Sequence, residues 1–422
     1  MSKAVIFIAG QDPIRGLSGH PSYVRTHARA ATRAGFEPHI FCMSSPAGIT
    51  ETEYGVIHRV ELPFPRRFTQ TSGLGMRISM VGFDTPRLAS EIATFIRRHP
   101  GPHLIHGFGQ WGYTAVMVGR KMRLEGVQVA TINSVYGTYL HACEGKMAGL
   151  NQAHNLFQRL FFKGEWWWIK KVVNALEGQA YHDSQIVTHN YEAVAKLYRD
   201  EFGDRPDVRR IPYASEAAFL YREEMGQLPR PEVLGGWEPA DAPLIVSVSR
   251  HDARKGVDVL IRALGLVKRA GVPFRACITS GGPLWKQHRN LAQSLELDQT
   301  TILTGWVPDS YPYMQQADIF VLPSIRESSG SLAMLEAMQL GAAVIASNVD
   351  GIPEDITEGR DGLLFAPGNA EQLSQAIIRL LQDGELRRRL SQGARETFAR
   401  RFSAEAFTDA IRDLYGELGF LP

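Results

Sequence analysis

Residues 317–347, ADIFVLPSIRESSGSLAMLEAMQLGAAVIAS, constrain the fold of this chain more than any other stretch. A short apolar run at 319–322 predicts a buried strand, and the apolar spacing of 332–339 predicts a helix. Gly341 ends that helix, and the apolar run at 342–346 predicts the next strand. A strand, a loop, a helix and a second strand in this order are typical of a parallel sheet covered by helices.

The loop between that strand and that helix carries a predicted ligand site. Open α/β sheets bind ligands at the carboxyl ends of their strands, and the free N–H groups of a helix start suit a phosphate. Glu327 precedes the helix and Glu336 lies inside it. Because carboxylates accept hydrogen bonds from hydroxyl groups, ribose and sugar hydroxyls are natural partners. Together these features indicate a nucleotide sugar; the alternative is a solvated loop with Glu336 on an exposed helix face.

Length, charge and cysteine content exclude several classes of protein. A chain of 422 residues has room for two or three domains, and a net charge of +2 gives no strong basic field for nucleic acid. Cys42, Cys143 and Cys277 lie far apart and lack metal-binding spacing, as in a reducing compartment. The apolar runs are too short for a membrane span or a signal peptide. We therefore expect a cytoplasmic protein.

The first half of the chain alternates strands and helices in the same way. The apolar run at 4–9 predicts the first strand, and a loop with Gly16 and Gly19 leads into a predicted helix at 23–33. This loop lacks the G-x-G-x-x-G sequence, which argues against a nicotinamide cofactor. At the end of a later strand, His106 either contacts substrate or fills the core as a hydrogen-bonded histidine.

The segment 157–171 departs from this alternation. Basic and aromatic side chains together suit a membrane interface or an apolar substrate groove. The alternative is a helical hairpin that is buried against the first domain, because most aromatic stripes are core. The residues concerned are Phe157, Arg159, Phe161, Phe162, Lys163, Trp166, Trp167, Trp168, Lys170 and Lys171.

A loop at the start of the second half carries fixed positive charge. A predicted strand at 244–248 runs into Arg250, Arg254 and Lys255, and a helix follows Gly256. Two fixed cations at the carboxyl end of a strand suit a diphosphate, whose charge they offset as it leaves. A solvated basic loop is the alternative, but the position at a strand end favours the diphosphate.

Two further features complete the outline of the chain. The loop at 305–308, GWVP, offers backbone groups and an aromatic face to a base. Residues 223–243 are rich in Pro, Gly and charge, and they predict a linker between domains. The α/β alternation on both sides of this linker predicts two Rossmann-like domains, 1–222 and 244–403, that face a cleft.

Taken together, these motifs resemble the retaining glycosyltransferases of family 4 (glycosyl transferases group 1), which have the GT-B fold. The resemblance covers nearly the whole chain, is strongest at 244–402, and implies an acceptor-binding N-terminal domain and a donor-binding C-terminal domain. It also implies that the last helix, within 404–422, packs back on the first domain. The motifs that carry it are SVSRHDARKGVDVLIRAL, ITSGGP, LTGWVPD, ADIFVLPS, LEAMQLGAAVIAS, GIPEDI and DGLLFAPGN.

The resemblance also implies roles for single residues. Arg250 and Lys255 resemble the pair that holds the donor diphosphate, and Glu327 resembles the residue beside the donor sugar. These three are the predicted catalytic residues. Glu336 resembles the glutamate that binds the ribose, and Val307 would contact the base through its backbone. The other predicted donor-site residues are Gly19, which would lie against the phosphates, and Ser329, Gly330, Ser331 and Leu332, whose backbone would contact sugar and phosphate.

Four positions depart from the family pattern. Glu327 and Glu336 lie nine residues apart, where the family usually has eight. The histidine-x-histidine of the family reads His106-Gly107-Phe108, so Phe108 removes a polar contact with the donor sugar. These departures allow an unusual donor or weak activity. The other two are Ser18-Gly19 for the glycine pair and Tyr213-Ala214 for the Asn-Gly that follows Ile-Pro.

The implied reaction is a retaining transfer from a nucleotide-diphosphate sugar, with UDP favoured over GDP, to an acceptor hydroxyl. It requires no metal and no cofactor, and the sequence offers no Asp-x-Asp pair placed to hold a metal on the diphosphate. From the segment 157–171 we expect a lipid-linked glycan of cell-surface polysaccharide biosynthesis as acceptor, with peripheral contact at the inner membrane face. A soluble sugar or small metabolite is the second choice.

Three other functions stay open at this point. An inverting transferase would use His20 as its general base, because Gly19-His20 resembles the glycine–histidine pair of inverting GT-B enzymes. A nucleotide-sugar epimerase of similar fold would convert the donor without any acceptor. A non-catalytic GT-B protein that binds a partner or a membrane would explain Phe108 and the unusual spacing of the glutamates.

Overall fold

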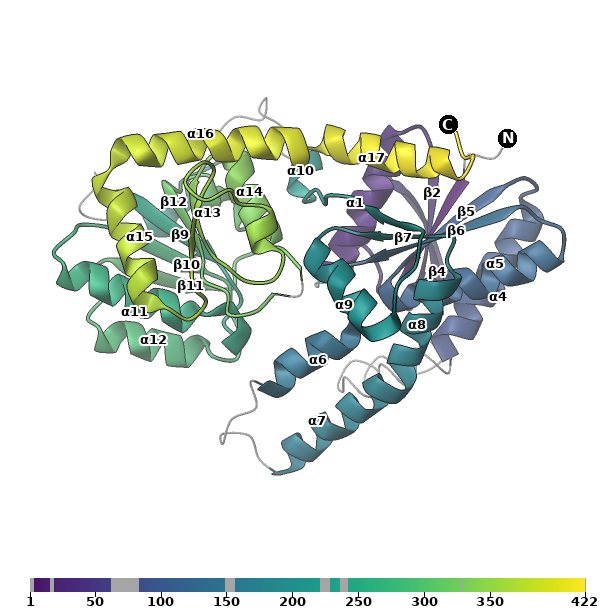
Figure 1. Cartoon of the computed structure of the whole chain (residues 1–422), viewed down its shortest axis with the longest axis horizontal. Helices are drawn as coiled ribbons and strands as arrows, with labels where there is room; N and C mark the ends of the chain where they lie inside the picture. Colours follow the sequence, from purple (N-terminus) through teal and green to yellow (C-terminus); the bar gives the residue numbers. More distant parts are fainter. Residues whose placement is uncertain are drawn as a thin grey trace. The chain divides into compact units, whose positions relative to one another are not determined.

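The computed structural model of this chain describes residues 4–15, 19–61, 83–148, 156–220, 228–235, 242–327 and 329–421. The chain divides into two compact units, and Figure 1 colours it along the sequence. Unit 1 consists of Met1–Phe219 and Ala404–Pro422, and unit 2 consists of Leu220–Ser403. Gly16, Ser18 and parts of the predicted linker lie outside the described residues.

Unit 1 is built on an eight-stranded sheet with the order β3-β4-β2-β1-β5-β6-β7-β8. Neighbouring strands are parallel, except that β3 pairs with β4 in antiparallel fashion at one edge. All six residues of β1 are buried, because helices cover both faces of the sheet, and this strand therefore reads as a continuous apolar run. The strands are β1 (Ala4–Ala9), β2 (Glu37–Met43), β3 (Gly48–Thr52), β4 (Gly55–Val60), β5 (His103–Phe108), β6 (Val129–Val135), β7 (Ile186–His189) and β8 (Val208–Arg210).

The helices of unit 1 come from both ends of the chain. The last helix, α17, packs against α1, and its Tyr415 hydroxyl lies 3.1 Å from Nδ1 of His106. Arg33 of α1 also pairs with Glu405 of α17 at 3.3 Å. The prediction that the last helix returns to the first domain is therefore confirmed. The helices that flank the sheet include α1 (Gly19–Arg33), α4 (Thr85–Arg98), α5 (Gly112–Leu124), α8 (Asn174–Asp183), α9 (Glu192–Phe202) and α17 (Ala404–Glu417).

A helical excursion separates β6 from β7. It consists of α6 (Tyr139–Ala148), α7 (Leu156–Trp168) and the π-helical turn η3 (Ile169–Val173), and it leads into α8. Ile169 and Val173 are buried in the core of unit 1, and Trp166 and Trp168 pack against that core. The indole of Trp167 points the other way and is 57% exposed. The three consecutive tryptophans therefore divide between core and surface, and packing against the first domain holds for Trp166 and Trp168.

Unit 2 contains a six-stranded parallel sheet with the order β11-β10-β9-β12-β13-β14. This is the doubly wound order of a Rossmann-like domain, and the strand order reverses between β9 and β12. Figure 1 shows the helices of unit 2 packed around this sheet. The strands are β9 (Leu244–Val248), β10 (Arg275–Thr279), β11 (Thr301–Gly305), β12 (Ile319–Leu322), β13 (Ala343–Ser347) and β14 (Leu363–Phe365); the helices include α11 (Val257–Arg269), α12 (Trp285–Ser294), α13 (Tyr311–Met314), α14 (Leu332–Leu340), α15 (Ala370–Gln382) and α16 (Gly384–Arg401).

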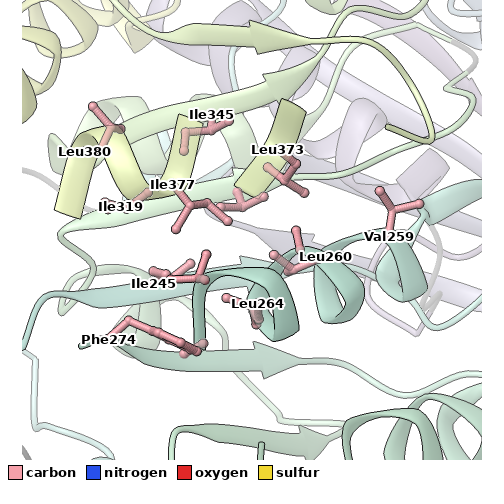
Figure 2. Packing of buried hydrophobic residues seen from close by; sticks show 14 of the residues in the cluster. Ile245, Val259, Leu260, Leu264, Phe274, Ile319, Ile345, Leu373, Ile377 and Leu380 are labelled. Carbon is pink, nitrogen blue, oxygen red and sulfur yellow. The ribbon is translucent and has the colours of Figure 1, made fainter. Parts of the chain in front are cut away.

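The core of unit 2 lies between its sheet and the helices α11 and α15. Figure 2 shows Leu260 and Leu264 of α11 and Leu373 and Ile377 of α15 directed toward the apolar side chains of the strands, such as Ile245. Each of these five side chains is at most 1% exposed. Burial of such aliphatic side chains is the main favourable term in folding, at roughly 25 cal/mol per Å² of apolar surface. Both units are Rossmann-like α/β domains, so the predicted fold class is confirmed.

Candidate functional site

The cationic loop after β9 is held in one conformation by local contacts. The carboxylate of Asp252 accepts a hydrogen bond from the backbone N–H of Arg254 at 3.1 Å and so caps the short turn η6 (Ala253–Lys255). Gly256 follows with φ of 58°, a left-handed conformation that glycine adopts without strain. A Cβ atom on Gly256 would lie 2.1 Å from the carbonyl oxygen of Pro323, so glycine is required for close contact with the next strand end.

Backbone hydrogen bonds join this cationic loop to the loop after β12. The carbonyl of Arg254 accepts hydrogen bonds from the N–H groups of Ile325 at 2.7 Å and Arg326 at 3.1 Å. Because β9 and β12 are the adjacent strands at which the sheet order reverses, these loops meet where doubly wound sheets bind their ligands. The fold thus brings together the loops that carry Lys255 and Glu327, which are separated by 72 positions in the sequence.

Lys255 and Glu327 form an ion pair at this junction. The ammonium group of Lys255 donates to Oε1 of Glu327, which also accepts a hydrogen bond from the hydroxyl of Ser324 at 2.7 Å. The side chains of Lys255 and Glu327 are 20% and 7% exposed, so the pair is largely removed from solvent. A mostly buried carboxylate needs such partners, because removal of one partner leaves an uncompensated charge.

Arg250 lies near this pair in the sequence but in a different environment. Its side chain is 69% exposed, and the carboxylate of Asp252 lies 3.9 Å from its Nε. The guanidinium group is therefore open to an incoming anion, whereas the ammonium group of Lys255 is already held. The predicted pair of cations thus consists of one fixed and one exposed group.

The loop before α14 is anchored from both sides. The hydroxyl of Ser331 caps α14 by accepting the N–H of Met334 at 3.4 Å, and the carbonyl of Ser329 accepts the N–H of Gly351 at 3.0 Å. Both serines are buried: Ser329 is 5% exposed and Ser331 is 8% exposed. Gly330 and Leu332, half-buried, complete this segment, and Glu336 lies half-buried in the second turn of α14.

A third strand end of unit 2 presents backbone and an aromatic ring. Ser280, with φ of 89°, donates its N–H to the carbonyl of Gly305 at 2.8 Å, across a register shift between β10 and β11. Gly305 has φ of 72°, and the following indole of Trp306 is 72% exposed. Val307 is half-buried. The predicted donor-site residues of unit 2 therefore all follow strands of one sheet at their carboxyl ends, or lie on the helix that follows.

The two predicted site residues on β5 belong to the interior of unit 1. His106 is fully buried, with Nε2 2.7 Å from the hydroxyl of Ser134 and Nδ1 3.1 Å from that of Tyr415. Burial holds the pKa of His106 well below its usual value, so the imidazole is neutral. Phe108 is 3% exposed, and its ring centroid lies 5.0 Å from that of His27. In this arrangement both ring nitrogens of His106 are engaged by protein hydroxyls.

Gly19 and His20 begin α1. Nε2 of His20 accepts the backbone N–H of Gly10 at 3.0 Å, and burial lowers the pKa of His20 to about 4. A general base would use Nε2 to take the proton of the attacking hydroxyl group. Here Nε2 already accepts the N–H of Gly10, which weighs against His20 as a general base.

One residue of the site region has no role in the sequence interpretation. Asp350, in the loop after β13, accepts the backbone N–H of Glu327 at 2.5 Å. The only signal in the sequence is the Asp-Gly pair, Asp350-Gly351, which marks a turn but does not indicate a contact with a loop 23 positions away.

A small cavity of about 130 Å³ lies in unit 1, away from these residues. Tyr181, His189, Tyr198 and Arg205 are among its walls, between α8, α9 and the strands β6 to β8. Ligand sites usually measure about 300–1,000 Å³, so this cavity is too small for a nucleotide sugar. In the described part of the chain no three His, Cys, Asp or Glu side chains are grouped to hold a metal ion, and no helix is long and apolar enough to cross a membrane.

Two family models match this chain, one over each half. Residues 17–214 match the model described as Glycosyltransferase Family 4, and residues 237–397 match the model described as Glycosyl transferases group 1. A curated relative, the lipopolysaccharide core biosynthesis glycosyltransferase LpsD of Rhizobium meliloti, is 36% identical over 177 residues, which are 42% of this chain and 50% of the relative. The chain thus matches the curated relatives over about half of their length.

Solved structures resemble the chain over nearly its whole length. Sucrose-phosphate synthase from Thermosynechococcus elongatus has a TM-score of 0.69 at 22% identity and covers 99% of both chains. HepE of Anabaena, solved in complex with UDP-glucose, has a TM-score of 0.64 at 14% identity and covers 98% of this chain and 99% of its own. At such identities the likeness shows the fold, and that fold is GT-B.

Proposed function

This chain belongs to the group 1, family 4 glycosyltransferases of GT-B fold, and from this premise we propose that it is a retaining enzyme that takes a sugar from a UDP-sugar. The sugar passes to a hydroxyl group of a cell-surface glycan or glycolipid. The names of relatives support this class of acceptor: two are lipopolysaccharide core biosynthesis glycosyltransferases, and one is a putative colanic acid biosynthesis glycosyltransferase.

The observation that carries the proposal is the Lys255–Glu327 pair at the switch point of the unit 2 sheet. A donor diphosphate carries negative charge that grows on its leaving oxygen as the sugar bond breaks. In this proposal Lys255 and the exposed Arg250 offset that charge, and preorganised charge of this kind is often the largest single contribution to catalysis. The N–H groups at the start of α14 suit a phosphate in the same way.

In the proposed reaction the acceptor hydroxyl attacks on the face from which the diphosphate departs. The hydroxyl proton passes to the leaving phosphate oxygen, so the anomeric configuration is retained. Glu327 lies beside the donor sugar and Glu336 binds the ribose hydroxyls, which leaves the protein to position the reactants. Anomer analysis of the product tests this step, since an inverted product would refute it.

Thermal shift measurements against nucleotides and nucleotide sugars, with and without chelator, test the donor. A ligand that binds only the folded state raises the melting temperature. We expect UDP and one UDP-sugar to give the largest shift, with or without chelator, and Lys255→Ala to abolish it. The matched control is Lys268→Ala, which should keep the shift. Lys268 lies on the surface of α11 and pairs with Glu296. No shift with any nucleotide would favour a non-catalytic binding protein.

We propose further that the surface of α7 and η3 contacts an anionic membrane that presents the acceptor. Leu160 and Trp167 are 58% and 57% exposed, and Lys163, Lys170 and Lys171 are exposed beside them. Exposed aromatic and basic side chains on one helical segment suit the headgroup region. The wild type should float with anionic vesicles and less with neutral ones, and Trp167→Ala should weaken flotation. Absence of flotation with anionic vesicles would refute the contact.

A further inference from the structure

The loop after β13 holds the loop after β12, and this geometry leads to an inference that rests on the proposed function. We propose that Asp350 is a positioning residue for sugar transfer. Through a hydrogen bond to the backbone of Glu327 it fixes the Glu327 carboxylate, and through that carboxylate it fixes the ammonium group of Lys255. Asp350 is thus an addition to the residues that the family resemblance identifies.

The first support is the contact itself. Oδ2 of Asp350 accepts the N–H of Glu327 at 2.5 Å, and the next residue, Gly351, donates its N–H to Ser329 at 3.0 Å. The two bonds hold the β12 loop on either side of position 328. A hydrogen bond to a carboxylate is roughly twice as strong as one between neutral groups, so the bond to Asp350 is the stronger hold.

The second support is the backbone of Asp350. Its φ is 49°, and among the described residues only Ser280 and Glu296 share a positive φ without being glycine. This conformation costs free energy for a residue with a side chain, and the cost is smallest for Asp and Asn, whose short polar side chains can form local hydrogen bonds. Glycine would adopt the same turn without strain, but glycine could not accept the N–H of Glu327.

The third support is the chain of contacts that follows. Glu327 is 5% exposed, and Oε1 is shared by the hydroxyl of Ser324 and the ammonium group of Lys255. Ser324 and Lys255 contact the carboxylate of Glu327, whereas Asp350 contacts its backbone N–H. A shift of that backbone would therefore move the carboxylate and its cation together, and misplacement of about 1 Å can cost a hundredfold in rate.

Three substitutions separate the hydrogen bond from the turn. Asp350→Gly keeps the positive φ and removes the acceptor. Asp350→Asn keeps an acceptor oxygen in a residue that tolerates positive φ, so it should restore the function. Asp350→Ala removes the acceptor and keeps the strain, so it should resemble Asp350→Gly in activity and melt at a lower temperature.

The first measurement needs no donor. Each variant is treated with an acylating reagent, and the modification rate of Lys255 is followed by peptide mass spectrometry. We expect Asp350→Gly to acylate Lys255 at least about threefold faster than the wild type, because the amine is no longer held against Glu327, and Asp350→Asn to match the wild type. The surface residue Lys268 is the internal control and should react equally in all chains.

The second measurement is transfer kinetics with the donor found by thermal shift. Asp350→Gly should lower kcat about tenfold and change KM less than threefold, with Asp350→Asn near wild type, because the lost interactions matter most in the transition state. A melting temperature equal to that of the wild type would show that Asp350→Gly is folded.

The outcomes separate the two proposals. If Asp350→Gly keeps both the wild-type Lys255 acylation rate and the wild-type kcat, or if Asp350→Asn behaves like Asp350→Gly, the positioning role is overturned. If the wild type binds no nucleotide diphosphate, the proposed function fails, and the acylation rates still decide whether Asp350 holds Lys255 in place.

Discussion

In both units the strand order reverses beside the first strand, but the units differ in what they place at that point. In unit 2 the loops after β9 and β12 carry charge: Lys255 pairs with Glu327, whose backbone N–H donates to Asp350 of the loop after β13, and Arg250 is exposed. In unit 1, neutral rings of β1 and β5 lie next to each other, and the ion pair after β1, between Asp12 and Arg59, involves β4 and not β5. There Phe108 of β5 packs on Phe7 of β1, at a centroid distance of 6.1 Å.

The neutral rings of unit 1 form a cluster of buried and half-buried side chains. His27 lies between Phe108 and Phe407, with centroid distances of 5.0 Å to each, and its Nε2 is 3.0 Å from the hydroxyl of Tyr136. Tyr23 stacks on Tyr136 at 4.1 Å. One fold therefore supports a charged, partly open edge in one unit and a packed aromatic edge in the other, so function has to be argued from side chains and not from topology.

The largest expected effect comes from removing the fixed charge of unit 2. Lys255→Ala should lower the transfer rate by a factor of about 100 to 1,000, because it removes a preorganised cation and leaves Glu327 buried without it. Initial rates at donor concentrations far below KM, which give kcat/KM, measure the effect. Lys268→Ala is the control, and a rate within threefold of wild type for Lys255→Ala would remove the distinction between the two edges.

The next effect concerns the buried histidine of unit 1. His106→Ala should lower the free energy of unfolding by about 2–4 kcal/mol, because it opens a cavity and removes partners from the hydroxyls of Ser134 and Tyr415. Urea titration followed by circular dichroism measures it. UDP affinity should stay within about twofold of wild type if His106 is structural; a tenfold loss with unchanged stability would instead place His106 in the donor site.

A pH effect should also arise in unit 1. Burial lowers the pKa of His27 to about 4, below the 6.5 of an exposed histidine, so the unfolded chain takes up its proton first as the pH falls. The contribution of His27 to the free energy of unfolding is therefore complete above pH 6.5 and is lost as the pH falls toward 4. About 2 kcal/mol of this free energy is lost between pH 7 and pH 5.

Urea midpoints across this pH range measure the loss. His27→Gln keeps hydrogen-bonding groups but does not titrate, so it should reduce the pH dependence by the share of His27; the other buried histidines, among them His20 and His106, keep theirs. An unchanged slope would show that His27 is not buried neutral in the folded chain.

The smallest effect distinguishes the faces of α7 within unit 1. Trp167→Ala should change the free energy of unfolding by less than about 0.5 kcal/mol, because its side chain is 57% exposed. Trp168→Ala, the neighbouring control, should cost at least about 2 kcal/mol, since Trp168 packs against the core. Urea denaturation compares the two. If both variants lose at least about 2 kcal/mol of unfolding free energy, both indoles are core residues, and the proposed membrane surface is removed as well.

The sequence predicts the charged edge of unit 2 better than the aromatic edge of unit 1. Arg250, Lys255 and Glu327 lie in the loops that follow two short apolar runs, so recognition of these strands places them near the carboxyl ends. His106 also ends such a run, but its environment depends on Tyr415, which is 309 positions away on the last helix. The local pattern therefore leaves two interpretations of His106 that only the packing of α17 distinguishes.

Two further features depend on geometry that residue patterns do not contain. The role of Asp350 follows from a positive φ and from a contact between two loops. The division of Trp166, Trp167 and Trp168 follows from the angle at which α7 and η3 meet the core, and consecutive residues on a helix point about 100° apart. A run of three tryptophans thus predicts an aromatic surface without saying which ring is exposed.

The return of α17 to unit 1 has a consequence for the order in which the chain is synthesised. Unit 2 is one continuous segment, Leu220–Ser403, so it is complete as soon as the ribosome has passed it. Unit 1 begins to emerge first, yet the helix that supplies Tyr415 to His106 is translated after all of unit 2. Because domains generally fold as units during synthesis, the second half of this chain can finish folding before the first.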